Sequence, residues 1–363
     1  MPGGSGPARV DPGHDGHDRW APRRGRKRIK GSMVPEAEFT SYYGRPILKK
    51  PTWKNPDVPI YLWVGGMAGS SSVAAAIAEA TGRPVLRRAG RLVAAGGAMV
   101  GTVALIHDLG RPERFLNMLR VIKPTSPLSI GSWILSPFAA FASAAAASEV
   151  TGIAPGLGRL AGWGAALFGP PLASYTGVLF ADTAIPAWHE ARGELPVLFA
   201  ASGAAAGAGA QLVATGITGA GMRERAPAVR LAVAGAAAEL AAGEALERRL
   251  EQLPGDVVGA YRTGKAGRWN RLARVLTALG GLGALLAGLG GRRGRVAAVA
   301  SGAALAAGSL ATRFAVFEAG LASSQNPDHV VGTQRERLAA EGPASAEGSW
   351  LENERTTRPL PRA

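Results

Sequence analysis

Residues 195–222 read LPVLFAASGAAAGAGAQLVATGITGAGM and contain no charged side chain. A helix needs about 20 mostly apolar residues to cross the hydrocarbon core of a bilayer, and about 17 are tolerated. Six further stretches also lack Asp, Glu, Lys and Arg: 58–78, 92–107, 124–148, 160–181, 275–291 and 296–312. At least six of these seven stretches are long enough to span, so the sequence predicts a polytopic integral membrane protein.

We expect an all-α fold with eight transmembrane helices. Seven of them cover 59–80, 88–107, 129–150, 160–184, 194–216, 271–290 and 295–317. The remaining one is expected over 228–250, where Glu239 and Glu244 interrupt the apolar pattern. A carboxylate is costly inside a membrane, so these two residues face a polar interior or this helix is only partly immersed.

Three regions are predicted along the chain. Residues 1–57 are rich in Gly, Pro and charge, which is typical of a basic, mostly disordered arm. Residues 58–320 form the eight-helix membrane domain, and 321–363 form a polar C-terminal tail. Twelve Arg and Lys residues precede the first helix, so the positive-inside rule places both termini in the cytoplasm and the chain in the cell membrane. Basic residues on the opposite side weaken this orientation: Arg83, Arg87, Arg88, Arg292, Arg293 and Arg295.

The composition excludes several classes of protein. The net charge of +15 lies in the N-terminal arm and between apolar runs, as expected for a chain that binds the lipid bilayer and not nucleic acid. The chain has no cysteine, which excludes disulfides, cysteine-ligated zinc and an iron-sulfur cluster of its own. No apolar signal core follows the basic run 23–30, so we expect no cleaved signal.

A first polar cluster directly follows the second expected helix. It reads HDLGRPERF over 107–115, and KPTSP at 123–127 and GSW at 131–133 lead into the next helix. His107 beside Asp108 is a plausible proton acceptor, and a nearby Arg111 could tune its proton affinity. The alternative is an interfacial cap in which Asp108 and Arg111 pair at headgroup depth.

A second cluster closes the fourth expected helix. It contains SYTG at 174–177 and PAWHE at 186–190. With eight spans, this loop and the first cluster lie on the same face, which favours a shared site. Tyr175 falls about two turns inside the helix, where its hydroxyl either serves that site or bonds to a backbone carbonyl.

Other polar residues of the apolar segments suggest no haem or metal site. Of the five His, only His107 and His189 lie near helices, and both lie at helix ends, so a pair of buried axial haem ligands is not expected. No set of His, Asp and Glu has metal-ligand spacing. Arg313 and Glu318 in the last helix form either a terminal anchor pair or, with Glu239 and Glu244, a proton path.

Together these motifs resemble the NrfD and polysulfide reductase membrane-subunit family. The resemblance rests on 107–115, 123–127, 131–133, 174–177 and 186–190, and on RFAVFEAG at 313–320, and it extends from about 42 to 337. It implies two four-helix bundles and a haem-free subunit that binds menaquinone or ubiquinone non-covalently. It also implies two partners, a ferredoxin-like iron-sulfur subunit and a molybdopterin catalytic subunit, as in formate dehydrogenase, polysulfide reductase or nitrite reductase complexes.

The resemblance also implies where the quinone binds. The family's pocket lies in the first bundle, and by position its polar groups correspond to His107, Asp108 and Tyr175, supported by Arg111. Tyr175 and His107 would hold the ring oxygens and Asp108 would take the proton, with no catalytic centre beyond this quinone site. Two alternatives stay open: a secondary transporter or ion channel lined by Glu239, Glu244 and Arg313, and an anchor without quinone chemistry.

Overall fold

The computed structural model describes residues 47–109, 113–120 and 122–341, and within these ranges all regular elements are helices. Eight helices have 23 residues or more: α1 (Asp57–Ala80), α2 (Pro84–Asp108), α4 (Pro127–Thr151), α5 (Pro155–Ala181), α7 (Glu194–Thr218), α8 (Met222–Glu251), α10 (Gly264–Leu286) and α11 (Gly291–Ser324). Four are shorter: α3 (Glu113–Met118), α6 (Pro186–His189), α9 (Gly259–Arg262) and α12 (Pro327–Glu341). Seven of the eight long helices overlap the seven uncharged stretches, and α8 covers the charged segment 228–250, where the remaining helix is expected.

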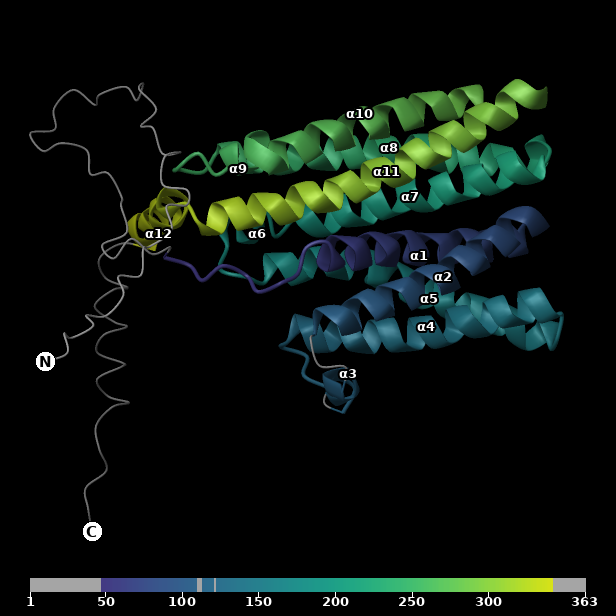
Figure 1. The fold of residues 1–363 in the computed structure, drawn as a ribbon, viewed down its shortest axis with the longest axis horizontal. Coiled ribbons are helices and arrows are strands. Elements are labelled where there is room, and N and C mark those ends of the chain that lie inside the picture. The colour runs from purple at the N-terminus through teal and green to yellow at the C-terminus, as the bar shows by residue number, and fades with distance from the viewer. Residues whose placement is uncertain (1–46, 110–112, 121, 342–363) are drawn as a thin grey trace, which may run out of the picture. The chain divides into compact units, whose positions relative to one another are not determined.

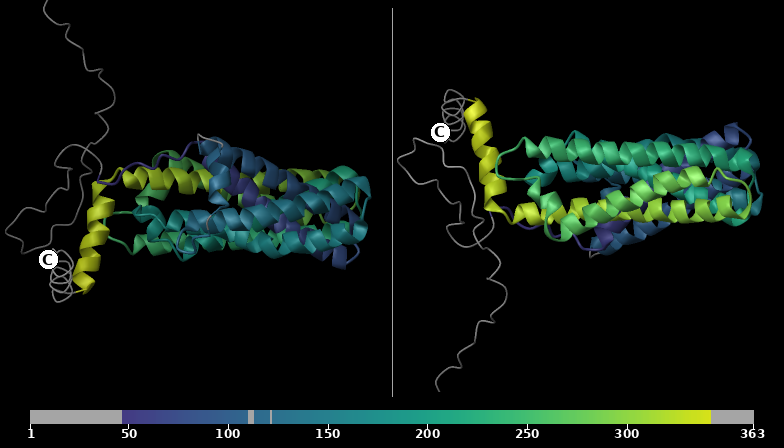
Figure 2. Two further views of the ribbon diagram at one scale, coloured as in Figure 1. Left: turned by 90° about the horizontal axis from the view of Figure 1, so that it is seen from below. Right: turned by 90° about the horizontal axis from the view of Figure 1, so that it is seen from above.

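The long helices pack side by side as two groups of four (Figure 1). The first bundle consists of α1, α2, α4 and α5, and the second of α7, α8, α10 and α11. Helix α1 also packs on α7, which joins the two bundles. The short helices α6 and α9 lie toward one end of the molecule, which is termed here the α6 end (Figure 1). Figure 2 shows α12 crossing beyond this end.

Five of the long helices are long and apolar enough to cross a membrane: α1, α2, α4, α7 and α11. The fold is thus all-helical in its described part and that of a multi-pass membrane protein. The observed ends differ from the predicted ones at several helices, most clearly at the start of α10, which is Gly264 and not 271. Helix α2 begins at Pro84 and not at 88, because Arg87 and Arg91 bind Glu149 of α4 within the bundle.

The last helix also runs further than its charge pattern indicates. Helix α11 continues to Ser324, and α12 follows inside the region expected to be a polar tail. The expected disordered arm of residues 1–57 lies mostly outside the described residues.

Small residues set the spacing between helices. Gly69 of α1 and Gly169 of α5 approach so closely that a Cβ on either would overlap the other's carbonyl oxygen. Gly209 of α7 and Gly302 of α11 do the same in the second bundle. Lipid is as apolar as the helix surfaces, so the hydrophobic effect does not hold helices together in a membrane. Close van der Waals contact between backbones stabilises their association instead.

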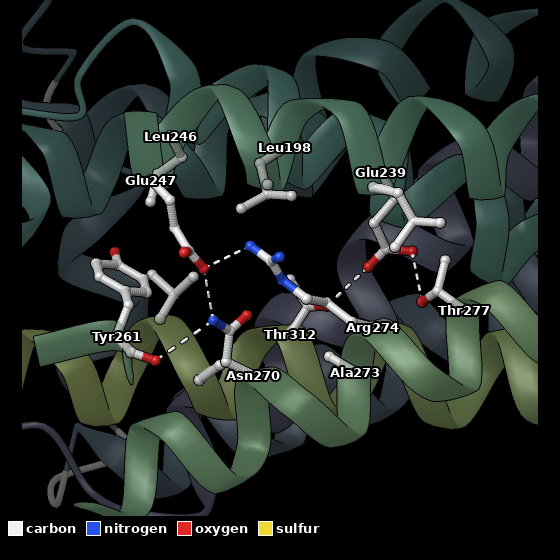
Figure 3. Close-up of a pocket in the computed structure, with 14 residues that line it drawn as sticks. Leu198, Glu239, Leu246, Glu247, Tyr261, Asn270, Ala273, Arg274, Thr277 and Thr312 are labelled. Atoms are coloured by element: carbon white, nitrogen blue, oxygen red, sulfur yellow. Dashed lines mark hydrogen bonds and ion pairs between the residues drawn. The ribbon is translucent and has the colours of Figure 1, made fainter. Parts of the chain in front are cut away.

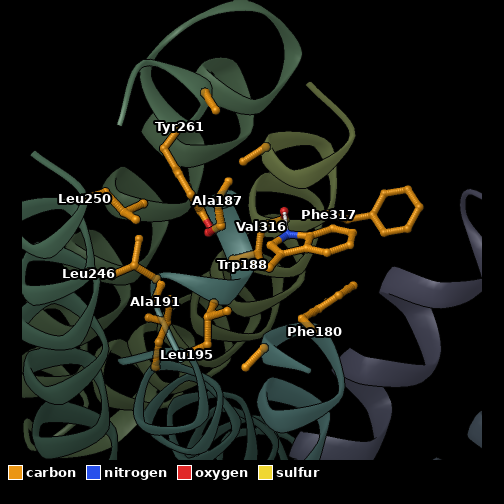
Figure 4. Close-up of a cluster of buried hydrophobic side chains, with 14 of the residues drawn as sticks. Phe180, Ala187, Trp188, Ala191, Leu195, Leu246, Leu250, Tyr261, Val316 and Phe317 are labelled. Carbon is orange, nitrogen blue, oxygen red and sulfur yellow. Dashed lines mark hydrogen bonds between the residues drawn. The ribbon is translucent and has the colours of Figure 1, made fainter. Parts of the chain in front are cut away.

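A cluster of large apolar side chains closes the α6 end (Figure 4). Its centre is the fully buried Trp188, whose Nε1 donates to the Val316 carbonyl oxygen at 2.7 Å. The Tyr261 hydroxyl donates to the carbonyl of Ala187 at 3.2 Å. The cluster fixes α6 against α9 and α11.

Candidate functional site

An apolar cavity lies inside the first bundle, between α1, α2, α4 and α5. The space open to a water-sized molecule is about 50 Å³, and about 570 Å³ when all space not filled by atoms, including open solvent, is counted. Its walls are mostly Gly, Ala and Leu, and the residues with hydroxyl groups are Tyr61, Ser132, Tyr175 and Thr176. The cavity therefore suits a flat apolar molecule with a few polar atoms.

Tyr175 reaches from α5 across to α4. Its ring lies on Gly131, and a Cβ at that position would overlap the phenol ring. The glycine of the GSW motif thus makes room for the tyrosine of the SYTG motif. The structure brings together two predicted motifs that are 44 positions apart in sequence.

Tyr61 of α1 lines the same cavity, and the sequence analysis did not single it out. It is the one tyrosine in the uncharged stretch 58–78, which is the signal that could have found it. Two phenols therefore line one apolar cavity from two helices.

His107 and Asp108 lie at the last turn of α2, just beyond the cavity wall. His107 is not buried: its side chain is 70% exposed, and Nδ1 lies 2.6 Å from Oδ2 of Asp57. The backbone N–H of Lys54 donates to Oδ1 of Asp108 at 2.9 Å, and Lys54 Nζ donates to the His107 carbonyl oxygen at 2.7 Å. Arg111 lies outside the described residues.

The two polar clusters lie at the same end of the molecule, the α6 end, as the span count predicts. The segment 47–56 connects them, because Lys54 holds the end of α2 while the neighbouring Trp53 stacks on Trp188 at 5.5 Å. His189 of the second cluster lies with Nδ1 3.1 Å from the Ala181 carbonyl oxygen, so it caps α5.

The four residues predicted for a proton path separate in the structure. Glu239 and Arg313 are buried in the second bundle, at 3% and 0% exposure. Glu244 is 46% exposed and pairs with Arg248 at 3.0 Å. Glu318 accepts a hydrogen bond from Nδ2 of Asn55 at 2.9 Å. The structure therefore does not place the four in one chain of contacts.

A second cavity reaches Glu239 from the α6 end, and its polar lining was missed by the sequence analysis (Figure 3). Besides Glu239 it is lined by Glu247, Asn270, Arg274 and Thr277, among others. Glu247 follows Glu239 by eight positions, a spacing that keeps both on one stripe of a helix, whereas the five-residue spacing to Glu244 does not. That periodicity is the signal that could have selected Glu247.

Residues 50–323 match the family model described as polysulphide reductase, NrfD. The chain belongs to the NrfD family. The match includes the first-bundle cavity and both polar clusters, and it confirms the resemblance seen in the motifs. A comparison with curated proteins finds no match. Membership makes this NrfD protein a membrane subunit of a molybdoenzyme complex.

Proposed function

We propose that this NrfD protein is the membrane-anchoring, quinone-interacting subunit of a molybdopterin oxidoreductase complex. One observation carries the proposal: an apolar cavity in the first bundle is lined by the phenols of Tyr61 and Tyr175, near the end where both polar clusters meet. Apolar walls with a few convergent polar groups are typical of small-molecule sites in proteins.

The residues of the cavity fit menaquinone or ubiquinone. When bound, a quinone supplies two-electron redox chemistry coupled to two protons. In our proposal Tyr175 and Tyr61 donate hydrogen bonds to the ring oxygens. Asp108 follows the wall residue Leu105 by one turn and exchanges the proton, with His107 and Arg111 supporting it.

Electrons would pass between this site and a ferredoxin-like iron-sulfur partner, because the chain has no cysteine to hold a cluster. The α6 end is the docking face in this proposal. It carries a hollow lined by Lys49, Lys50 and Trp53, among others, which offers cationic and aromatic contacts to a protein surface. The molybdopterin subunit then acts on a small substrate such as formate, polysulfide or nitrite.

We further propose that all eight long helices cross the cell membrane and that the α6 end faces the cytoplasm. Helices α5, α8 and α10 have 27, 30 and 23 residues, and at about 1.5 Å per residue each exceeds the roughly 30 Å hydrocarbon core.

Since the chain has no cysteine, single introduced cysteines report their own accessibility. Labelling of α5–α6 loop positions by an impermeant maleimide in inside-out vesicles, and not in intact cells, is the expected result.

The test of function uses the purified complex. Tyr175→Phe and Asp108→Asn should each lower quinone-coupled turnover while the partner subunits still copurify. Asp182→Asn is the matched control, because Asp182 is exposed at the same end and does not line the cavity. Unchanged turnover in both site variants would contradict the assignment.

A further inference from the structure

The second bundle holds a carboxylate in its interior. Glu239 lies near the middle of α8, and its two oxygens accept hydrogen bonds from two neighbouring helices. Oγ1 of Thr312 donates to Oε1 at 2.7 Å, and Oγ1 of Thr277 donates to Oε2 at 3.2 Å. Hydroxyl donors can serve either an anionic or a protonated carboxyl group, because each hydroxyl can also accept a hydrogen bond.

Arg313 is buried in the same bundle as Glu239, and none of the ion pairs between described residues joins the two. Arg313 donates from Nη2 to the Phe199 carbonyl oxygen at 2.9 Å, and its guanidinium carbon lies 4.0 Å from the centre of the Phe199 ring. Its Nε and Nη1 are buried and have no hydrogen-bond partner among the residues that the structure describes. Arg313 therefore acts on Glu239 through its charge and not through a shared hydrogen bond.

A cavity connects Glu239 to the α6 end (Figure 3). At its outer end Glu247 accepts hydrogen bonds from Asn270 Nδ2 at 2.8 Å and Arg274 Nη2 at 2.5 Å. Arg262 Nε donates to the same carboxylate at 3.0 Å, and the Arg262 and Arg274 side chains are 48% and 40% exposed. The polar lining thus begins at solvent and ends at the buried carboxylate.

On the opposite side of Glu239, buried Ala and Leu side chains pack closely, including Ala236, Ala284 and Leu305. Thr215, Arg225 and Ser301 are buried in the same half of the bundle. Gly281 and Ala236 meet so closely that a Cβ on the glycine would lie 2.7 Å from the alanine Cβ. The residues that line the cavity lie level with Glu239 or on its α6 side, so the cavity extends from Glu239 toward that end.

We propose that Glu239 is a proton-binding site, loaded from the α6 end through a half-channel whose entrance is Glu247. A proton from water at that end passes to the Glu239 carboxylate, converts it to the carboxylic acid, and returns by the same route. Arg313 of α11 and Arg274 of α10 are the charged groups that face this route, and Glu244 and Glu247 lie on α8 itself. In α7 the sole charged residue is Glu194, in the first turn. The site is separate from the first-bundle cavity and does not depend on quinone binding.

Infrared difference spectroscopy of the purified full chain, without quinone, tests this proposal. Acidification should produce a carboxylic-acid carbonyl band that shifts in D₂O and is lost in Glu239→Gln. Thr312→Val keeps the carboxyl group but removes one hydrogen bond, so it should move the band without abolishing it; this variant covers the case in which Glu239→Gln fails to fold.

The role of Glu247 as the entrance of the half-channel is tested by the rate of H/D exchange at the Glu239 carboxylic acid. Glu247→Gln should keep the band and slow its H/D exchange on the order of tenfold or more, the size of effect typical for loss of a proton-transfer group. Glu318→Gln is the control and should leave the rate unchanged, because Glu318 lies toward the same end on α11, binds Asn55 and does not line the cavity. No band that depends on Glu239, or exchange in Glu247→Gln as fast as in the wild type, would overturn the proposal.

Discussion

The indole of Trp188 lies against the Cα atom of Gly320, and no side chain larger than hydrogen fits between them. This contact locks the PAWHE motif after α5 to the FEAG motif of α11. Close packing thus joins the motifs at the α6 end. Trp188 is fully buried there, and Trp53 of the segment 47–56 stacks on it.

Gly320→Ala should destabilise the protein by roughly 1–3 kcal/mol, since the added methyl group overlaps the indole and forces the ring to move. The measurement is the thermal unfolding midpoint in detergent. Gly96→Ala is the control, because a Cβ at Gly96 of α2 meets no atom within 4 Å. Equal midpoints for the two variants would contradict the contact.

Gly131→Ala should weaken quinol-analogue binding about tenfold, equivalent to about 1.4 kcal/mol, because Tyr175 would be displaced from the cavity. Gly156→Ala, in the first turn of α5 with open space around it, should bind like the wild type. Unaltered affinity in Gly131→Ala would show that the position of Tyr175 does not matter for the ligand.

An ion network in the first bundle, at the end opposite the α6 end, joins Arg91 and Arg159 to glutamates. Loss of Arg91 should lower the free energy of unfolding much more than loss of Arg159. Arg91 is 6% exposed and pairs with Glu79 at 2.6 Å and Glu149 at 2.9 Å, whereas Arg159 is 67% exposed. Arg91→Ala removes the buried cation and leaves Glu149 with Arg87 alone and Glu79 with Arg159 alone, so it should cost about 3 kcal/mol of unfolding free energy, the lower end of the range for a broken buried pair. Arg159→Ala should cost less than about 1 kcal/mol, as exposed pairs do. Similar losses in chemical denaturation would refute this ranking.

Docking of α12 should weaken in acid. Burial lowers the pKa of His329, although Asp256 and Asp328 act in the opposite direction, and Nδ1 lies 3.1 Å from Oγ of Ser323. The folded state therefore binds a proton at His329 less readily than the unfolded chain does. The stabilisation of the folded state by neutral His329 is complete above the ordinary pKa of about 6.5 and is lost as the pH falls below it. Limited proteolysis of the C-terminal region should accelerate from pH 7 to pH 5. His329→Gln should remove most of that pH dependence; an unchanged profile would contradict the role of His329.

The sequence predicted the helices well because the absence of charge over 17 or more residues is a local property. It also predicted that two polar clusters share one end, since an alternating helix order fixes which loops meet. It could not predict that Asp57, 50 positions before His107, binds that histidine and keeps it at the surface. Periodicity places Glu247 on the same stripe of α8 as Glu239, but it does not tell which way that stripe faces, because this depends on how α8 is rotated against α10 and α11.

Helix ends were harder to predict than helix cores. A count of charged residues places the start of α2 after Arg87, yet Arg87 lies inside the helix, where it pairs with Glu149 of α4. Such pairs join helices that are distant in sequence, so no local pattern reveals them.

The most direct test of the central claim is binding of a fluorescent quinol analogue to the detergent-purified chain. The account predicts saturable binding that menaquinone displaces, and it predicts weaker binding in Tyr175→Phe at an unchanged thermal midpoint. Absence of binding in a folded, monodisperse sample, or equal affinity in Tyr175→Phe, would contradict a quinone site in the first bundle.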